Sequence, residues 1–289
     1  MGTLVTIQVL TEGPDVAAAV DRAFGWFREI EGRCTRFDPE SELMRLCRET
    51  GHTVRVSAVL FEAVRFSIEV ARLSGGAFDP TIGRRMERRG FNRNYQTGAR
   101  VNSGAADGAA NWREIELDAE QRTIRLHREL TLDLGSVAKG LAADAAAREL
   151  AEFRDFAIDA GGDLYLGGCN SGGGPWRVGI RHPQRPGEVI ARVAVSNQAV
   201  CTSGGYERPI AGMVGEHHVL DPRTGRSPRG VASATVIAPH AMMADALATA
   251  AFVLGPEKGL DLLERAGTEG LIVTADLAEF RTRALGDAA

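Results

Sequence analysis

Hydrophobic positions along the chain follow two different periods, which predicts helices and strands in alternation. Apolar residues that recur every three to four positions are typical of helices packed against a core. We expect helices at residues 14–31, 59–73, 136–153, 239–254 and 260–266. Alternation with a period of two, or a short apolar run between turn residues, is typical of strands. We expect strands at residues 3–10, 113–117, 123–126, 130–134 and 231–238, and strands and turns over 156–203.

These elements place the protein in the α+β class. Residues 113–117 and 123–126 have the spacing of a hairpin, and the Gly-rich segment 171–175 is expected to join a second hairpin, of residues 164–168 and 176–180. The sequence shows no internal repeat, no low-complexity linker and no break in composition. We therefore expect one large domain over residues 1–289, with mixed or antiparallel sheets flanked by helices.

Composition excludes several classes of protein. The chain has 289 residues, of which 44% are hydrophobic and 25% charged, and these values are ordinary for a globular protein. The net charge of −4 argues against a general electrostatic grip on nucleic acid. No apolar window reaches the roughly 18 residues that a membrane span needs.

The start of the chain and its cysteines bear on the compartment. Residues 1–15 lack the basic and apolar regions of a signal peptide. We therefore expect a cytoplasmic protein, or a cell-envelope lipoprotein if an export segment precedes this sequence. The four cysteines are far apart and form no CxxC pair, so reduced thiols are expected, without a metal site or a disulfide framework.

The segment LDLGSVAKG, residues 132–140, is the first candidate site. A strand is expected to end at Asp133, small residues turn the chain, and a helix follows. The free N–H groups and dipole of a helix N-terminus attract phosphate or pyrophosphate, and Lys139 would add a cation within reach. The alternative is an ordinary turn between strand and helix, with Asp133 as its capping residue.

A pair of oxygen side chains in the apolar helix 239–254 is the second candidate. The helix is apolar on nearly every face, which predicts that it is buried. Asp245 and Thr249 are four positions apart and so share one face. A buried carboxylate is costly unless it is paired or binds a metal, and carboxylate plus hydroxyl suits Mg²⁺. Alternatively, Asp245 pairs with a buried arginine, and Thr249 bonds to the carbonyl four residues earlier.

Two loops are further candidates. In GGAFDPTIG, residues 75–83, Phe78 offers a flat apolar surface and Asp79 begins a rigid turn, which suits either a ring-binding loop or a plain connection. In HHVLDPRTG, residues 217–225, His218 titrates near neutral pH and is a candidate acid or base, whereas a structural role is expected for His217. The arginine-rich run 84–89 would contact a substrate phosphate or form a solvated turn.

Several known signatures are absent. The sequence contains no GxSxG, Walker A, HExxH or strand-linked GxGxxG motif. Classical hydrolases, P-loop NTPases and Rossmann enzymes are therefore excluded.

Taken together, eight segments resemble the ApbE family of flavin transferases, which move FMN from FAD onto a threonine or serine of a protein. The segments follow the family's order over nearly the whole chain. They are MGT at residue 1, SELMR at 41, AFDPTIG at 77, LDLGSVAKG at 132, AGGDLYLGG at 160, SGGYER at 203, HHVLDPRTG at 217 and ADALATAAFVLG at 244. One departure is Gly205, where the family often has Asp, so a possible acid, base or hydrogen-bond partner is missing.

The resemblance implies an α+β architecture similar to the T-fold and a set of site residues. It implies that Asp245 and Thr249, with the backbone of Ser136, hold Mg²⁺. It implies FAD contacts from Met1, Phe37, Ala77, Phe78, Asp79, Asp133, Lys139 and Leu220. Phe78 or Phe37 would pack against a ring of FAD, and His218 is the candidate that removes the acceptor's proton.

The implied reaction is attack of an acceptor hydroxyl on the FMN phosphorus of FAD, with AMP leaving. The acceptor would be a protein with a motif ending in Ser/Thr-Gly-Ala-Thr or similar, such as a subunit of a redox pump. The first alternative is a Mg²⁺-dependent FAD pyrophosphatase, in which water is the acceptor. The second is a carrier that binds FAD without turnover, although a carrier needs no metal beside the pyrophosphate.

Overall fold

The largest sheet of the protein is antiparallel. The computed structural model describes residues 2–95, 97–104, 111–207, 210, 213 and 215–286, so Met1 lies outside the described residues. Within them, seven strands form this sheet in the order β1 (Val5–Val9), β5 (Phe156–Ala160), β6 (Leu164–Gly167), β9 (Gln198–Gly204), β10 (Val231–Ala238), β11 (Glu269–Thr274) and β12 (Glu279–Arg281). Each pair of neighbours is antiparallel.

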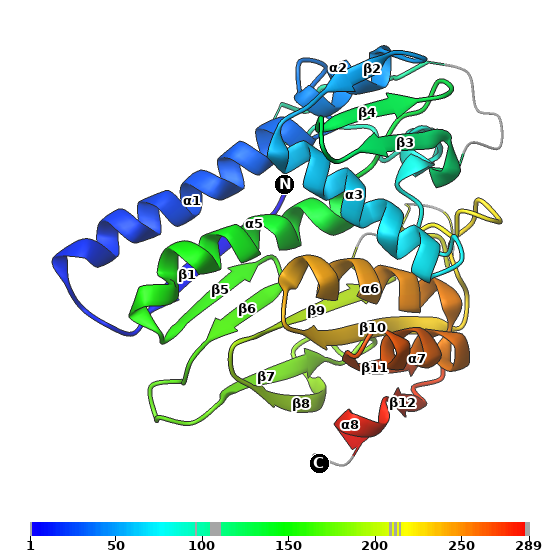
Figure 1. Ribbon diagram of the computed structural model, residues 1–289. Helices are drawn as coiled ribbons and strands as arrows, with labels where there is room; N and C mark the ends of the chain where they lie inside the picture. The colour runs from blue at the N-terminus through cyan, green and yellow to red at the C-terminus, as the bar shows by residue number, and fades with distance from the viewer. Residues whose placement is uncertain are drawn as a thin grey trace.

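Helices cover one face of this sheet. Figure 1 shows α5 (Gly135–Leu150) and α6 (Ala241–Leu254) lying along it, with α1 (Pro14–Cys34) and α7 (Pro256–Arg265) beside them. Ala142, Ala146 and Phe252 have no exposed surface, and they belong to one continuous apolar core beneath these helices. The small residues of α5 allow it to lie close to α6, as the sequence pattern of a buried helix requires.

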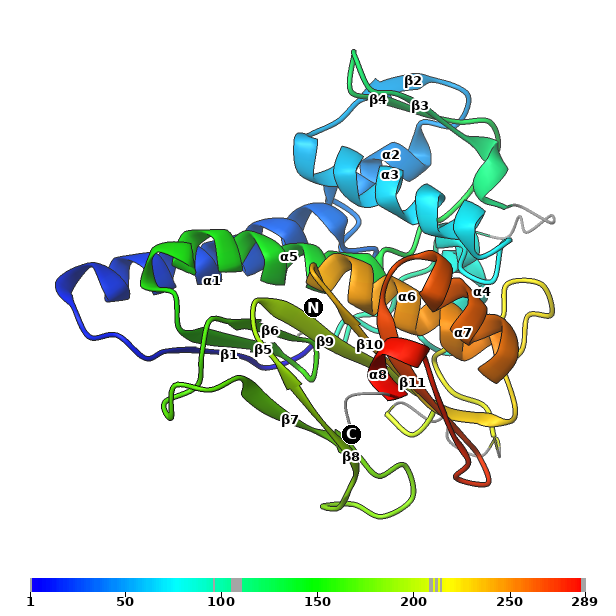
Figure 2. The same cartoon turned by 60° about the horizontal axis from the view of Figure 1, so that its bottom comes forward.

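A second layer lies on the far side of the helices. It consists of α2 (Glu42–Arg48), α3 (Ala58–Leu73) and a small sheet in the order β2 (Thr53–Arg55), β4 (Thr123–Leu126), β3 (Ile115–Asp118), as Figures 1 and 2 show. Short helices connect the layers: η1 (Pro80–Ile82), α4 (Gly83–Arg88), η2 (Trp112–Glu114) and η3 (Ala151–Phe153). The small sheet contains the hairpin predicted at residues 113–126.

The opposite face of the large sheet is also covered. The ribbon of β7 (Trp176–Arg181) and β8 (Val189–Val195), together with α8 (Arg283–Gly286), builds a second apolar cluster there. Ile237 and Val273 point into this cluster, while Val236 and Ile272 belong to the main core. Strand β10 is therefore buried on both faces, which explains why it is mostly apolar, with the buried Ser233 and Thr235 as its polar residues.

The α+β class with antiparallel sheets and flanking helices is confirmed, but two local predictions are wrong. Residues 130–134 are not a strand: the Gly83 N–H donates to the Thr131 carbonyl at 3.0 Å and the Asp133 N–H to the Pro80 carbonyl at 2.7 Å, so this segment bonds to η1 and α4 instead of a sheet. Its leucines are buried in the core, which produced the apolar pattern. Strands β6 and β7 do not form a hairpin, because β6 pairs with β5 and β9, and β7 pairs with β8.

Candidate active site

A cavity of about 1290 Å³ opens where the helices meet the large sheet. Its walls come from segments far apart in the sequence: residues 34–39, 90–95, 133–139, 159–164, 200–207 and 218–220, with two residues of α6. Eight of the residues predicted for the site line it, namely Phe37, Asp133, Ser136, Lys139, His218, Leu220, Asp245 and Thr249. The fold therefore gathers most of the predicted site in one place.

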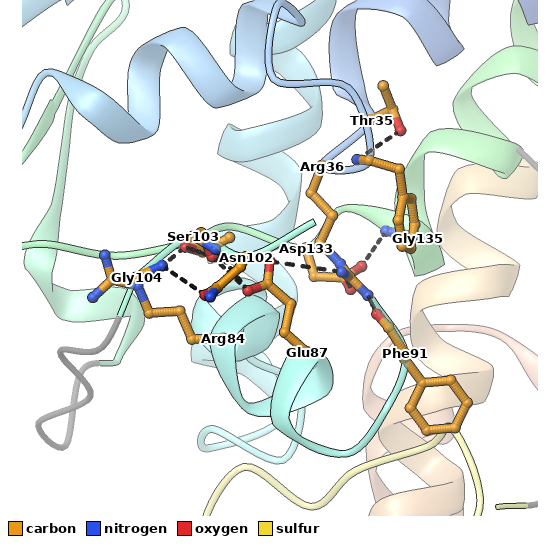
Figure 3. Close-up of polar contacts among 12 residues, drawn as sticks. Thr35, Arg36, Arg84, Glu87, Phe91, Asn102, Ser103, Gly104, Asp133 and Gly135 are labelled. Carbon is orange, nitrogen blue, oxygen red and sulfur yellow. Dashed lines mark hydrogen bonds and ion pairs between the residues drawn. The ribbon is translucent and has the colours of Figure 1, made fainter. Parts of the chain in front are cut away.

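The turn before α5 presents Asp133 to this cavity. One carboxylate oxygen accepts from the Gly135 N–H at 2.9 Å, so Asp133 caps the start of α5, and the other accepts from Arg36 Nε at 2.6 Å (Figure 3). Burial alone would raise the pKa of Asp133, but the Arg36 charge and the Gly135 N–H hold it below its usual value. The sequence offered two alternatives for Asp133, a capping role and a place in the candidate site. In the structure Asp133 has both.

Lys139 lies between two buried carboxylates. Its Nζ is 2.9 Å from Asp245 Oδ2 and 3.1 Å from Asp163 Oδ2, and it also donates to the Gly135 carbonyl at 3.1 Å. Burial alone would lower the pKa of Lys139, but the two carboxylates raise it above its usual value. Lys139 is therefore a fixed cation of the cavity wall, and the buried partner of Asp245 is a lysine instead of the arginine considered from the sequence.

Among the acids of the site, the carboxyl group of Asp245 has the most strongly shifted pKa. Burial and the negative charge of Asp163 raise its pKa to about 7, while the Lys139 ammonium acts in the opposite direction. Two carboxylates with side chains 6% and 7% exposed share one ammonium, which leaves an excess of negative charge in the wall. A further cation beside Asp245 would offset that charge.

The oxygen donors around Asp245 fit a hard cation. Thr249 lies one turn along α6, and its hydroxyl is 3.1 Å from the Ser203 hydroxyl on β9. The Ser136 backbone, with φ −93° and ψ 18°, departs from helical geometry at the start of α5, and Ser136 lines the same cavity. No cluster of three or more His, Cys, Asp or Glu side chains suited to a metal occurs in the described part of the chain. Mg²⁺ nevertheless suits this donor set, since it retains several waters and takes few protein ligands.

The two neighbouring histidines have different surroundings. His218 lines the cavity. His217 is buried, its ring is edge-on to Phe252 with centroids 5.3 Å apart, and its Nδ1 accepts from the Val219 N–H at 3.3 Å. Burial lowers the pKa of His217, and the nearby Arg89 charge lowers it further. The structural role expected for His217 agrees with its burial, and His218, the candidate acid or base, lies at the cavity.

The arginine-rich run is not a solvated turn. Arg89 donates to Glu216 Oε2 at 2.7 Å, to Ser227 Oγ at 2.8 Å and to the His217 carbonyl at 3.2 Å. Arg85 donates to the Pro222 carbonyl. These contacts tie α4 to the segment that carries His218, so the run positions one wall of the cavity.

The segment 77–79 lies elsewhere. Ala77 and Phe78 are buried in the main core, and Asp79 accepts from the Thr81 N–H at 2.9 Å and the Trp112 N–H at 3.2 Å. None of the three is among the described residues that line the cavity, although Asp79 lines a smaller one of about 580 Å³. Phe37, the other predicted ring, does line the candidate site.

Three residues of the site were not singled out from the sequence. Asp163 follows two glycines in AGGDLYLGG, and this place after a turn is the one feature of the sequence that could have indicated a site residue. Ser203 begins the segment SGGYER. Nothing in the sequence distinguishes Arg36 from the many other arginines, because its contact with Asp133 joins positions 97 residues apart.

Comparison with known proteins identifies the family. A model of the ApbE family matches residues 1–272. The chain belongs to the ApbE family. An ApbE relative from Treponema pallidum, named FAD:protein FMN transferase, is 33% identical over 302 residues. The match covers 96% of this chain and 83% of that relative. A relative of the same name from Rhodobacter capsulatus is 32% identical over 97% of this chain, which spans only 55% of that protein.

The ApbE fold is confirmed by solved structures. The crystal structure of the ApbE protein from Thermotoga maritima has a TM-score of 0.86 and 29% identity, and covers 99% of this chain and 96% of its own. The flavin transferase ApbE from Vibrio cholerae has the same TM-score at 24% identity, which is evidence for the fold alone. No helix among the described residues has the length and apolar character to cross a membrane.

Proposed function

We propose that this ApbE-family enzyme transfers FMN from FAD to a threonine or serine hydroxyl of an acceptor protein, in a Mg²⁺-dependent reaction that releases AMP. The observation that carries the proposal is the cavity that brings Asp133, Lys139, His218 and Asp245 together. The names of the relatives support the substrate and the acceptor class. The acceptor would present its hydroxyl in a motif ending in Ser/Thr-Gly-Ala-Thr or similar, as a subunit of a redox pump would.

The chain's own residues account for the binding of FAD. Asp245 and Thr249, with the Ser136 carbonyl, would hold Mg²⁺, which supplies charge neutralisation at the pyrophosphate when bound. Gly135 and Ser136 at the start of α5 line the same cavity, and Lys139 adds a fixed positive charge. Phe37 offers a flat surface for a ring of FAD, and Asp133 and Leu220 complete the contacts.

The transfer itself is a substitution at phosphorus. The acceptor oxygen forms a bond to the FMN phosphorus while the bond from that phosphorus to the bridging oxygen breaks. AMP departs with the electron pair of the broken bond, and the hydroxyl proton passes to the His218 imidazole. Lys139 stabilises the negative charge that develops. The product is a flavin linked to the acceptor through a phosphoester.

One incubation tests this function. The enzyme is mixed with FAD and Mg²⁺, with or without a tagged acceptor that carries the threonine motif, and flavin fluorescence in the gel and AMP release are followed together. We expect labelled acceptor and AMP in equal amounts, a loss of both by at least a hundredfold (about 2.7 kcal/mol) in Asp245→Ala, and loss on chelation of the metal. Asp261→Ala, an exposed aspartate of α7 paired with Arg265, is the matched control.

Other outcomes would assign a different function. AMP without labelled acceptor would identify a pyrophosphatase. Bound, unchanged FAD in the presence of Mg²⁺ and acceptor would identify a carrier and contradict the proposal.

A further inference from the structure

A buried arginine connects three walls of the cavity. Arg36 is 4% exposed and lies two residues after the last residue of α1. Its Nε donates to Asp133 Oδ2 at 2.6 Å, and its Nη2 donates to the Phe91 carbonyl at 2.7 Å. Its guanidinium carbon lies 4.1 Å from the centroid of the Phe37 ring. One side chain thus contacts the turn before α5, the segment after α4 and the ring of residue 37.

A second carboxylate supports the far side of this guanidinium. Glu87 Oε1 is 4.0 Å from Arg36 Nη1, a buried nitrogen to which none of the described residues offers a hydrogen bond. Glu87 is held in turn by Ser103, whose N–H donates at 3.0 Å and whose hydroxyl is 2.8 Å from Glu87 Oε2 (Figure 3). Thr131 donates to the Ser103 hydroxyl at 2.8 Å. The arginine therefore lies in a chain of polar contacts that runs from the cavity into the protein.

This arrangement is costly as a source of stability alone. Removing a guanidinium and two carboxylates from water carries a desolvation penalty that ion pairing often fails to repay. The planar fork of arginine does, however, fix several partners in a defined geometry, which the single point charge of lysine cannot do. The positions that Arg36 fixes are those of Asp133 and Phe37, both in the cavity wall.

We propose that Arg36 is a positioning residue for FAD, which holds the Asp133 carboxylate and the Phe37 ring in the places that the substrate requires. Glu87 and Ser103 keep the guanidinium aligned. The inference rests on the proposed function only in taking FAD as the occupant of the cavity. Arg36 acts through Asp133 and Phe37. Its loss should therefore weaken the binding of FAD more than it slows the chemical step.

The test measures FAD affinity without acceptor and without metal, by quenching of flavin fluorescence. Arg36→Met keeps the volume and removes the fork, and we expect FAD to bind about tenfold to a hundredfold more weakly, as the loss of a charge-assisted contact predicts. Arg36→Lys should recover part of this loss. The control Arg33→Met removes a partly buried ion pair to Glu42 outside the cavity and should change the affinity less than twofold.

A double substitution separates positioning from folding. Arg36→Met leaves Asp133 without its partner, and adding Asp133→Asn removes that unpaired charge, so the double variant should regain thermal stability without regaining FAD affinity. If Arg36 acts through Asp133, the two effects on affinity are less than additive. A ligand-free crystal structure of Arg36→Met should show the Asp133 carboxylate and the Phe37 ring displaced.

Three results would overturn the inference: wild-type affinity in folded Arg36→Met, fully additive effects of the two substitutions, or unmoved Asp133 and Phe37 in the ligand-free variant. Failure of the proposed function gives a different result. In that case wild-type protein yields no labelled acceptor, whether or not AMP is released, while the ligand-free structure of the variant still decides the role of Arg36.

Discussion

Gly205 and His217 show how one small residue shapes the wall beside the cavity. A Cβ atom on residue 205 would lie 2.9 Å from His217 Cδ2 and 3.0 Å from its Nε2. Glycine therefore allows the buried ring to pack against this turn while its other edge meets Phe252. At this position, where the family often has Asp, a side chain would meet the His217 ring in the present packing.

The burial of His217 predicts a dependence of stability on pH. The pKa of His217 lies below the ordinary 6.5 because of burial, so between that lowered value and 6.5 the unfolded chain binds more protons than the folded one. The contribution of His217 to stability is complete above pH 6.5 and is lost as the pH falls below it. Protonation would also remove Nδ1 as the acceptor for the Val219 N–H.

Urea unfolding at pH 7.5 and pH 5.5 measures this effect. We expect His217→Asn, which cannot titrate, to lose less stability between the two pH values than the wild type loses. The exposed His52 provides the control, since His52→Asn should retain the wild-type difference. Equal pH dependence in the wild type and His217→Asn would show that the imidazole binds its proton equally in the folded and the unfolded chain.

At the level of elements, the contact between α5 and α6 sets the geometry of the polar site. Helix α5 contributes Lys139 and α6 contributes Asp245 to one ion pair. One turn further along α5, the Asp144 carboxylate accepts from the Ala241 N–H at 2.6 Å and the Met242 N–H at 3.0 Å, so α5 caps the start of α6. The two helices are thus joined by polar contacts at two places, beside the cavity and at the start of α6.

Gly140 permits this close approach, and it carries the second prediction. A Cβ at residue 140 would lie 2.4 Å from backbone atoms of Ala241, which have no flexible end that can move aside. We expect Gly140→Ala to lower the free energy of unfolding by about 1–3 kcal/mol, as overpacking does, and to weaken FAD binding by separating Lys139 from Asp245. Chemical unfolding and fluorescence titration provide the two measurements.

The control for this substitution is Gly25 in α1, where an added Cβ meets nothing within 4 Å. Gly25→Ala should stabilise the protein by about 0.5–1 kcal/mol, because alanine loses less conformational entropy in a helix than glycine. If Gly140→Ala matched this gain, the helices would not need their close contact.

Local patterns predicted the elements better than they predicted the site. Strand β10 and the helices α3 and α6 follow from short-range periodicity, which is visible in any window of the chain. Asp245 and Thr249 stood out because oxygen side chains are rare in an apolar helix. Asp163, the partner of Lys139, and Arg36, the partner of Asp133, did not stand out in the sequence. They approach these residues only through the tertiary fold. The segment 130–134 was assigned to a strand because a buried extended segment and a strand share one apolar pattern.

At the scale of the whole molecule, the cavity is a property of the complete fold. Its walls combine the end of α1, the segment after α4, the start of α5, residues of the strands β5, β6 and β9 of the large sheet, and one face of α6. The main apolar core likewise includes residues from α1 to β11. A ligand that contacts all these walls binds the folded chain and not the unfolded one, so its binding free energy adds to the stability of the whole.

The last prediction follows from this linkage. Thermal unfolding should show one transition, as expected for a single domain over residues 1–289, and FAD with Mg²⁺ should move that transition upward as a unit. At a free FAD concentration of 100 times its dissociation constant, the stabilisation is about 2.7 kcal/mol, which raises the melting temperature by several degrees. AMP, which lacks the flavin half, should give a smaller rise at equal concentration. Two transitions, of which FAD moves only one, would mean that part of the chain folds independently of the cavity, and the walls that this part contributes would then have to be assigned again.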